Sequence, residues 1–299
     1  MSFTLADCRV AVVGLGLIGA SLCADLTRLK VCREVRGVSR SSRTVARGIA
    51  EGIIDQGTTS LQTGVQGVDI VILASPVRIA IGQLERISGH LKEGAIVADV
   101  GSTSVEVVKA MARMPAHVQP IATHPMAGKE TSGFDSAERG LFDNATWILT
   151  PLERTSSRTV DVFRELVVAV GAHPLMMEPH KHDRVVAAIS HVPFLLSSAL
   201  VDSVVRAGEQ DPEVWECAAG GFRDTSRVAA SEAAMFIDIL MTNRENVHHQ
   251  LDRFIEGIRE LRSMLVERQE DELVARLSAN RDARLAWYAD WMERNRPEI

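Results

Sequence analysis

The chain has 299 residues, of which 46% are hydrophobic and 24% charged, and its formal net charge is −6. A chain of this length can bury a sizeable core and is expected to divide into two domains. The negative charge provides no basic field for nucleic acid, and the most apolar run, residues 192–205, is broken by proline, serine and aspartate, which argues against a membrane span. The four cysteines are scattered without metal-ligand spacing, so we expect no metal site and a reducing, cytoplasmic location.

A glycine-rich turn near the N-terminus is the most informative motif. An apolar run over residues 10–13 leads into three glycines spaced G-x-G-x-x-G, then a helical stretch and a second apolar run over residues 35–38. In a dinucleotide-binding βαβ unit the first glycine permits the tight turn, the second lets the backbone approach the pyrophosphate, and the third lets the helix pack on the sheet. The alternative is an ordinary glycine turn without a ligand. The residues predicted to bind the cofactor here are Gly14, Gly16, Leu17, Ile18 and Gly19.

The end of the second apolar run predicts which dinucleotide binds. Ser39 stands 20 positions after Gly19, where NAD-binding domains normally carry a carboxylate for the adenosine ribose. A hydroxyl followed by Arg40 and Ser41 instead supplies donors and positive charge that suit the 2′-phosphate of NADP. We therefore predict NADP as the cofactor, with NAD as the second possibility. The alternative is that Arg40 and Arg43 are solvated charges of a surface loop and bind no cofactor.

The pattern of apolar residues predicts two domains of different architecture. Up to about residue 178, short apolar runs alternate with helical stretches, which indicates an α/β fold with a doubly wound, Rossmann-type parallel sheet. From His182 onward apolar residues recur at the helical period, with no convincing strand before Ile299. We expect residues 1–178 to bind the dinucleotide and residues 179–299 to form an all-helical domain that binds substrate and forms a homodimer.

Polar residues follow three of the predicted strands. Because ligands bind at the carboxyl ends of parallel strands, Ser75 and Pro76 are expected to line the cofactor site. Ser102 and His124 follow two further strands and could act as an acid/base pair. On the residues alone, Ser102 could instead cap the following helix, and His124 could satisfy a buried backbone carbonyl.

Two clusters stand out in the helical half. His191 lies close to Pro193, which is expected to kink its helix. Arg227 ends the segment GGFRDTSR, which we expect to be a loop, and the planar fork of arginine suits a carboxylate. The alternatives are core packing for His191 and a surface salt bridge for Arg227.

Five motifs in this order, GLGLIGASL, DVGS, HPMAGKE, SHVP and GGFRDTSR, resemble those of the prephenate and arogenate dehydrogenase family. The resemblance spans nearly the whole chain. It implies oxidative decarboxylation of prephenate or arogenate in tyrosine biosynthesis, in which a hydride passes to C4 of the nicotinamide, CO₂ leaves and the ring becomes aromatic. A small-molecule substrate and a nicotinamide cofactor are therefore expected.

The resemblance also implies roles for individual residues. His124 matches the histidine that accepts the proton of the substrate 4-hydroxyl, and Ser102 matches the serine that orients this hydroxyl. Arg227 matches an arginine that binds a substrate carboxylate. His191 matches a histidine near the substrate, and Glu130 matches an acid that gates the pocket.

Departures from the family pattern bear on the substrate. Phe194 stands where prephenate-specific members often carry a second histidine, and Lys129 stands where threonine is frequent. The loss of a polar partner at Phe194 favours arogenate slightly, although Lys129 could bind the pyruvyl carboxylate of prephenate.

Two other functions stay open on the sequence. A 3-hydroxyacid dehydrogenase or imine reductase would use a lysine in the first helix of the second domain; Lys181 is present there, but the surrounding glycine pattern is not. A non-catalytic NADP-binding protein would share the glycine turn.

Overall fold

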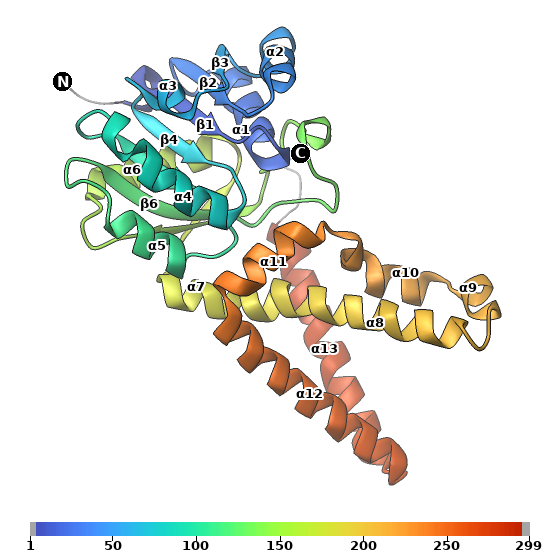
Figure 1. Cartoon of the computed structure of the whole chain (residues 1–299). Helices are drawn as coiled ribbons and strands as arrows, with labels where there is room; N and C mark the ends of the chain where they lie inside the picture. The colour runs from blue at the N-terminus through green and yellow to red at the C-terminus, as the bar shows by residue number, and fades with distance from the viewer. Residues whose placement is uncertain (1–3, 295–299) are drawn as a thin grey trace. The chain divides into compact units, whose positions relative to one another are not determined.

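The computed structural model describes residues 4–294, which form two compact units, one up to Arg244 and the other from Glu245 onward. The first unit contains an eight-stranded sheet with the strand order β3-β2-β1-β4-β5-β6-β7-β8 (Figure 1). The strands are β1 (Arg9–Val13), β2 (Glu34–Val38), β3 (Gln56–Thr58), β4 (Ile70–Leu73), β5 (Ile96–Asp99), β6 (Gln119–Pro125), β7 (Thr146–Pro151) and β8 (His173–Met176).

The sheet is parallel except at one pair of strands. Strands β6 and β7 pair antiparallel, with His124 opposite Ile148. Residues 126–145 between them contain the short 3-10 helix η3 (Phe134–Ser136) but no crossover helix, which a parallel connection requires. The doubly wound α/β fold is confirmed, but the expectation of a parallel sheet was wrong at this pair. The sequence analysis also missed β3, whose three residues contain no apolar run.

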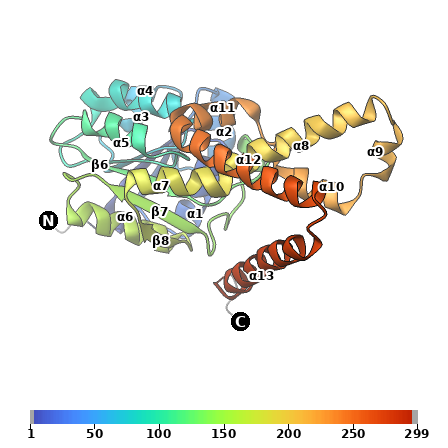
Figure 2. The ribbon, with the colours of Figure 1, turned by 90° about the horizontal axis from the view of Figure 1, so that it is seen from below.

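Helices cover both faces of the sheet because successive side chains of a strand point to opposite faces. Val10 and Val12 of β1 pack with α1 and α6, whereas Ala11 and Val13 pack with α3, α4 and α5. Figure 2 shows these two layers on opposite sides of the sheet. The helices of this region are α1 (Leu17–Arg28), α2 (Ser42–Ala50), α3 (Leu61–Val65), α4 (Val77–Ile87), α5 (Val105–Ala112) and α6 (Ser157–Ala169).

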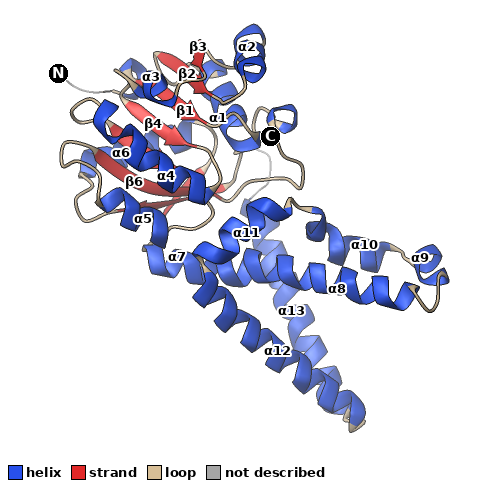
Figure 3. Ribbon diagram, in the orientation of Figure 1, coloured by secondary structure: helices blue, strands red, loops and turns tan. Residues whose placement is uncertain are grey.

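A long continuous helix follows the last strand of the sheet. It runs from Pro179 to Gly208 and comprises α7 (Pro179–Val186), the π-helical segment η4 (Ala187–His191) and α8 (Val192–Gly208) (Figure 3). The irregularity expected at Pro193 is this π turn, a type of distortion that often accompanies functional residues. By length and composition alone this helix could cross a membrane, but it carries the buried polar residues His182 and Asp183, and we describe it as a helix of this fold.

The segment that contains Arg227 is helical, so the prediction of a loop was wrong. Residues 220–230 form α10 (Gly220–Ser226) and the 3-10 turn η5 (Arg227–Ala230). The hydroxyls of Thr225 and Ser226 donate to the carbonyls of Gly221 and Phe222, so these polar side chains are satisfied within the helix. The short helix α9 (Glu213–Cys217) precedes α10, and α11 (Ala233–Thr242) follows η5.

The second compact unit consists of two long helices, α12 (Arg244–Val266) and α13 (Glu270–Arg294). An ion pair between Glu260 and Arg276 joins them. Among its described residues, α13 has no buried side chain, and its apolar positions, including Leu277 and Leu285, are exposed. Both helices agree with the all-helical second half expected from the sequence.

Candidate active site

The glycine turn after β1 has the geometry that a diphosphate requires. Gly14 has a φ of 104°, and a Cβ there would overlap the carbonyl of Ala74. A Cβ at Gly19 would overlap the carbonyl of Gly14, whereas a Cβ at Gly16 would meet nothing within 4 Å. Packing therefore requires Gly14 and Gly19, and Gly16 leaves open space over the backbone.

This open space lies at the start of α1. The first turn of α1 contains Leu17 and Ile18 and no acidic residue, so its unpaired backbone N–H groups are available to an anion. Pro76 follows Ser75 and precedes the first residue of α4. The turn thus fits the pyrophosphate of a dinucleotide.

The end of β2 carries hydroxyl and guanidinium groups. The Oγ of Ser39 accepts the backbone N–H of Ser41 at 3.3 Å, and the Oγ of Ser41 caps α2 by accepting the N–H of Thr44 at 3.1 Å. Arg40 and Arg43 are exposed on either side of this cap. This strand end therefore offers donors and positive charge to a phosphate.

Asp99 ties together the two strand ends that carry Ser102 and His124. Its Oδ2 accepts the N–H of Gly101 at 2.8 Å, and its Oδ1 accepts the N–H of Thr123 at 3.1 Å. Burial raises the pKa of Asp99 to about 7, and the N–H groups of Gly101 and Thr123 act in the opposite direction. The carboxyl thus holds the turn before Ser102 next to the strand of His124.

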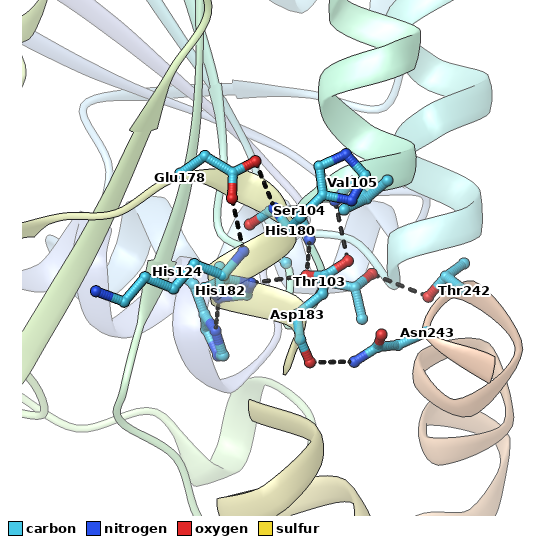
Figure 4. Close-up of polar contacts among 12 residues, drawn as sticks. Thr103, Ser104, Val105, His124, Glu178, His180, His182, Asp183, Thr242 and Asn243 are labelled. Atoms are coloured by element: carbon cyan, nitrogen blue, oxygen red, sulfur yellow. Dashed lines mark hydrogen bonds and ion pairs between the residues drawn. The ribbon is translucent and has the colours of Figure 1, made fainter. Parts of the chain in front are cut away.

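His124 belongs to a buried chain of hydrogen bonds (Figure 4). Its Nδ1 lies 2.9 Å from Nε2 of His182, and Nδ1 of His182 lies 2.8 Å from Oδ1 of Asp183. The Asp183 carboxylate also accepts the backbone N–H groups of Ser104 at 2.7 Å and of Val105 at 3.1 Å. Asp183, on α7, therefore caps the N-terminus of α5 and orients His182 at the same time.

This chain of bonds assigns the protons of the two rings. A carboxylate only accepts, so His182 donates its Nδ1–H to Asp183, and its Nε2 accepts the Nδ1–H of His124. The Nε2 of His124 then carries a lone pair that can accept a proton. Burial, together with the nearby rings of His182 and His191, lowers the pKa of His124 well below its ordinary value, so the imidazole is neutral at neutral pH.

The two alternatives weighed for Ser102 and His124 do not describe this site. The N-cap of α5 is Ser104, whose side chain makes no capping bond, and Asp183 supplies the capping oxygens instead. The bonded partner of His124 is a second imidazole rather than a backbone carbonyl. Ser102 is half-buried on the turn between β5 and α5, and its role in orienting a substrate stays a prediction.

His191 lies in the same polar cluster. It is 1% exposed, and its Nδ1 lies 3.2 Å from the Nδ2 of Asn243, which also donates to the backbone carbonyl of Asp183 at 2.7 Å. Its Nε2 is buried and has no hydrogen-bond partner within residues 4–294. Burial lowers the pKa of His191 to about 4. His191 thus belongs to the buried polar cluster around His124, and its contact with substrate stays a prediction.

The charged residues predicted to bind substrate are paired with each other or with neighbours. Arg227 forms an ion pair with Glu130, which follows β6 and lies six positions after His124. Lys129 forms an ion pair with Glu138 on the same loop. The structure thus places the carboxylate-binding candidate and the gating candidate in direct contact.

Sequence reasoning missed His182, Asp183 and Asn243. His182 and Asp183 form an adjacent His-Asp pair at the start of the helical half, but their partners lie 58 and 79 positions away in the chain. Lys181, the lysine that an alternative enzyme class would use, is exposed next to them. Within the described residues no group of side chains could hold a metal ion.

A dinucleotide turn and a buried, neutral histidine at the same edge of a sheet are typical of a nicotinamide-dependent dehydrogenase. The sequence matches the prephenate dehydrogenase nucleotide-binding domain over residues 23–176 and the prephenate dehydrogenase dimerization domain over residues 178–279. The chain therefore belongs to the prephenate dehydrogenase family, which confirms the resemblance seen in the motifs.

The similar proteins include both prephenate dehydrogenases and an arogenate dehydrogenase. Prephenate dehydrogenase of Bacillus subtilis (strain 168) is 35% identical over 254 residues, covering 84% of this chain and 68% of that protein. The solved prephenate dehydrogenase of A. aeolicus, in complex with hydroxyphenyl propionate and NAD⁺, is 30% identical with a TM-score of 0.86, covering 96% of this chain and 99% of that one. Synechocystis arogenate dehydrogenase is 31% identical with a TM-score of 0.80, covering 93% and 99%.

Proposed function

We propose that the chain catalyses the oxidative decarboxylation of arogenate or prephenate with NADP⁺. The observation that supports this best is the lone pair on Nε2 of His124, which the chain from Asp183 through His182 leaves free. When bound, the oxidised nicotinamide supplies the acceptor for the hydride. Nε2 of His124 takes the proton of the 4-hydroxyl as the carbonyl forms, while Ser102 orients that hydroxyl.

The same hydrogen bonds also stabilise His124 after it has accepted a proton. After proton transfer the imidazolium of His124 has its Nδ1–H directed at His182, which is in turn held by the Asp183 carboxylate. The negative charge at the far end stabilises the positive ring, as in other acid–histidine arrangements. Aromatisation of the ring with loss of CO₂ supplies the driving force.

Arg227 is proposed to bind a substrate carboxylate by exchange. In the ligand-free chain the guanidinium is paired with Glu130. An entering carboxylate replaces that of Glu130, so the guanidinium keeps a partner throughout and Glu130 is released at the mouth of the pocket. This gives Glu130 the gating role that the family resemblance implies.

The released Glu130 favours arogenate over prephenate. Both substrates carry a carboxylate on the side chain, but arogenate adds an ammonium group, which a free carboxylate attracts, whereas prephenate has an uncharged keto group there. Phe194 stacks on Phe236 with 3.7 Å between ring centroids and provides no donor. Lys129 is already paired with Glu138, which weakens it as a partner for the pyruvyl carboxylate.

We propose NADP⁺ as the preferred oxidant because of the polar and charged groups that follow β2. Ser39 and Ser41 supply hydroxyls, Arg40 and Arg43 supply positive charge, and Ser39 stands in place of the carboxylate that would repel a 2′-phosphate. Gly14, Gly16 and Gly19 would hold the pyrophosphate, next to Ser75 and Pro76.

We further propose a cytoplasmic homodimer. The match to a dimerization domain supports the dimer, and so do the exposed apolar side chains of α12 and α13, such as Ile258, Leu265 and Leu277. The four cysteines are free thiols, in keeping with a reducing compartment.

Steady-state assays with both substrates and both cofactors test the proposal. The purified chain is assayed with arogenate or prephenate and with NADP⁺ or NAD⁺, and reduced nicotinamide is followed by absorbance. We expect the highest kcat/KM with arogenate and NADP⁺. Absence of turnover with either substrate would refute the proposed activity, and faster consumption of prephenate in a mixture would show that Phe194 and Glu130 do not set the choice.

A further inference from the structure

Asn243 connects His191 to the backbone of Asp183 through a single amide group. We infer that Asn243 is a positioning residue that makes Nε2 of His191 a hydrogen-bond donor to an oxygen atom of the substrate. This inference deepens the proposed function and rests on it for the identity of the substrate, but the state it assigns to His191 can be measured without any substrate.

Both hydrogens of the Asn243 amide nitrogen are directed at acceptors. The residue caps the C-terminus of α11 and is 3% exposed. Its Nδ2 carries two hydrogens: one is donated to the carbonyl of Asp183 at 2.7 Å, and the other points at Nδ1 of His191 at 3.2 Å. Its φ of −126° is accessible to any residue, so the backbone gives no reason for an asparagine here.

The bond from Asn243 determines where His191 carries its proton. Because Nδ1 accepts, the proton of the neutral ring resides on Nε2. That N–H is buried and has no partner within residues 4–294, and buried donors in native proteins are nearly always paired. An unpaired donor beside the catalytic base, His124, is the arrangement expected where a ligand supplies the missing acceptor.

The surroundings keep His191 uncharged. The titratable groups near it are Asp183 and His182 on α7 and His124 on β6, and the low pKa of His191 shows that burial outweighs the attraction of Asp183. A neutral N–H donor binds a hydroxyl, carbonyl or carboxylate oxygen and rejects an ammonium group. The ammonium of arogenate must therefore be bound elsewhere, in keeping with the position of Glu130.

The first test measures the protonation of His191 in the ligand-free, full-length protein. Nitrogen-15 NMR distinguishes protonated from bare imidazole nitrogens, and the H191Q variant assigns the signals. We expect a protonated Nε2 and a bare Nδ1 at pH 7. A protonated Nδ1 would overturn the inference whether or not the protein turns over arogenate, so this result is separate from a failure of the proposed activity.

The variants N243D and T242V test the cause of that protonation. N243D keeps the shape of the side chain but offers acceptors in place of donors, so the proton of His191 should move to Nδ1. T242V removes the neighbouring contact between α11 and Thr103, where the two hydroxyls lie 2.9 Å apart, without touching His191. The tautomer should be unchanged in T242V, and a change of equal size in both variants would contradict a specific role for Asn243.

A double-mutant cycle tests the consequence for the substrate. N243A should raise KM for arogenate roughly tenfold with little change in kcat, because the donor of His191 is no longer held in place. In H191Q the glutamine amide carries its own N–H groups, so adding N243A should change KM little. An equal effect of N243A in both backgrounds would show that Asn243 only stabilises the fold, and the inference would fail.

Discussion

The carboxylate of Asp183 accepts the backbone N–H of Ser104 at 2.7 Å, although the two residues lie 79 positions apart in the chain. The contact attaches the first helix after the sheet, α7, to the start of α5. Because the same carboxylate orients His182, the position of His124, the proposed catalytic base, depends on this attachment. The contact that attaches α7 to α5 therefore also holds His182 and His124 in position.

Asp183→Asn should impair both catalysis and stability. An asparagine has one acceptor oxygen for three donors, so the bond to His182 or a bond to the start of α5 must be lost. We expect kcat to fall about 10- to 100-fold and the free energy of unfolding to fall by about 1–3 kcal/mol. Steady-state kinetics and urea unfolding measure these effects, with D161N on the exposed face of α6 as control. A variant with normal kcat would exclude Asp183 from the mechanism.

His124→Asn should remove the proton acceptor while preserving the fold. If the proton moves mainly in the transition state, kcat falls roughly 10²- to 10⁴-fold and KM changes little. The exposed His117 gives a matched control, since H117N should behave like the unmodified protein. Near-normal kcat in H124N would mean that another group takes the proton.

The pH dependence of kcat/KM should report the lowered pKa of His124. Burial and the neighbouring histidines disfavour the protonated ring, so a proton binds only at a pH well below 6.5. The unmodified protein should therefore keep its activity as the pH falls through 6.5 and lose it only at lower pH. The residual kcat/KM of H124N should not show this loss at low pH. An acid limb with a midpoint above 6.5 in the unmodified protein would contradict the assigned environment.

Glu130→Gln should weaken the preference for arogenate. The variant removes the carboxylate that pairs with Arg227 and that we expect to bind the ammonium of arogenate. KM for arogenate should rise and KM for prephenate should fall, so the ratio of the two kcat/KM values should shift roughly tenfold. R227A serves as the contrast because it should raise KM for both substrates. An unchanged substrate ratio in E130Q would remove Glu130 from substrate choice.

Ser39→Asp should reverse the cofactor preference. A carboxylate at the end of β2 repels the 2′-phosphate of NADP⁺ and can accept the ribose hydroxyls of NAD⁺. We expect kcat/KM to be higher with NADP⁺ in the unmodified protein and higher with NAD⁺ in S39D. Ser42→Asp, at the exposed first residue of α2, tests whether added charge alone has this effect. Equal or better use of NAD⁺ by the unmodified protein would refute the prediction.

Much of the fold was predictable because its signals are local. The glycine spacing after β1 and the alternation of apolar runs with helical periods each occupy a short stretch of chain. The errors arose where such signals were weak: β3 has three residues without an apolar run, and the reversal at β7 depends on the absence of a crossover helix.

The site was predictable only in part. Ser102 follows β5 and His124 lies at the carboxyl end of β6, where ligands bind in such sheets, and their motifs carried the family resemblance. His182, Asp183 and Asn243 act through contacts with residues 52 to 79 positions away, and no local pattern in one sequence reveals such pairs. The pairing of Arg227 with Glu130 likewise depends on the tertiary fold.

His124 is proposed to serve as the base in an oxidative decarboxylation. The most direct measurement follows reduced nicotinamide and released CO₂ together, with arogenate and NADP⁺, in the unmodified protein and in H124N. We expect equal amounts of the two products from the unmodified protein and a rate lower by roughly 10²-fold or more in H124N. Reduced nicotinamide formed without CO₂, or the same rate in both proteins, would contradict it.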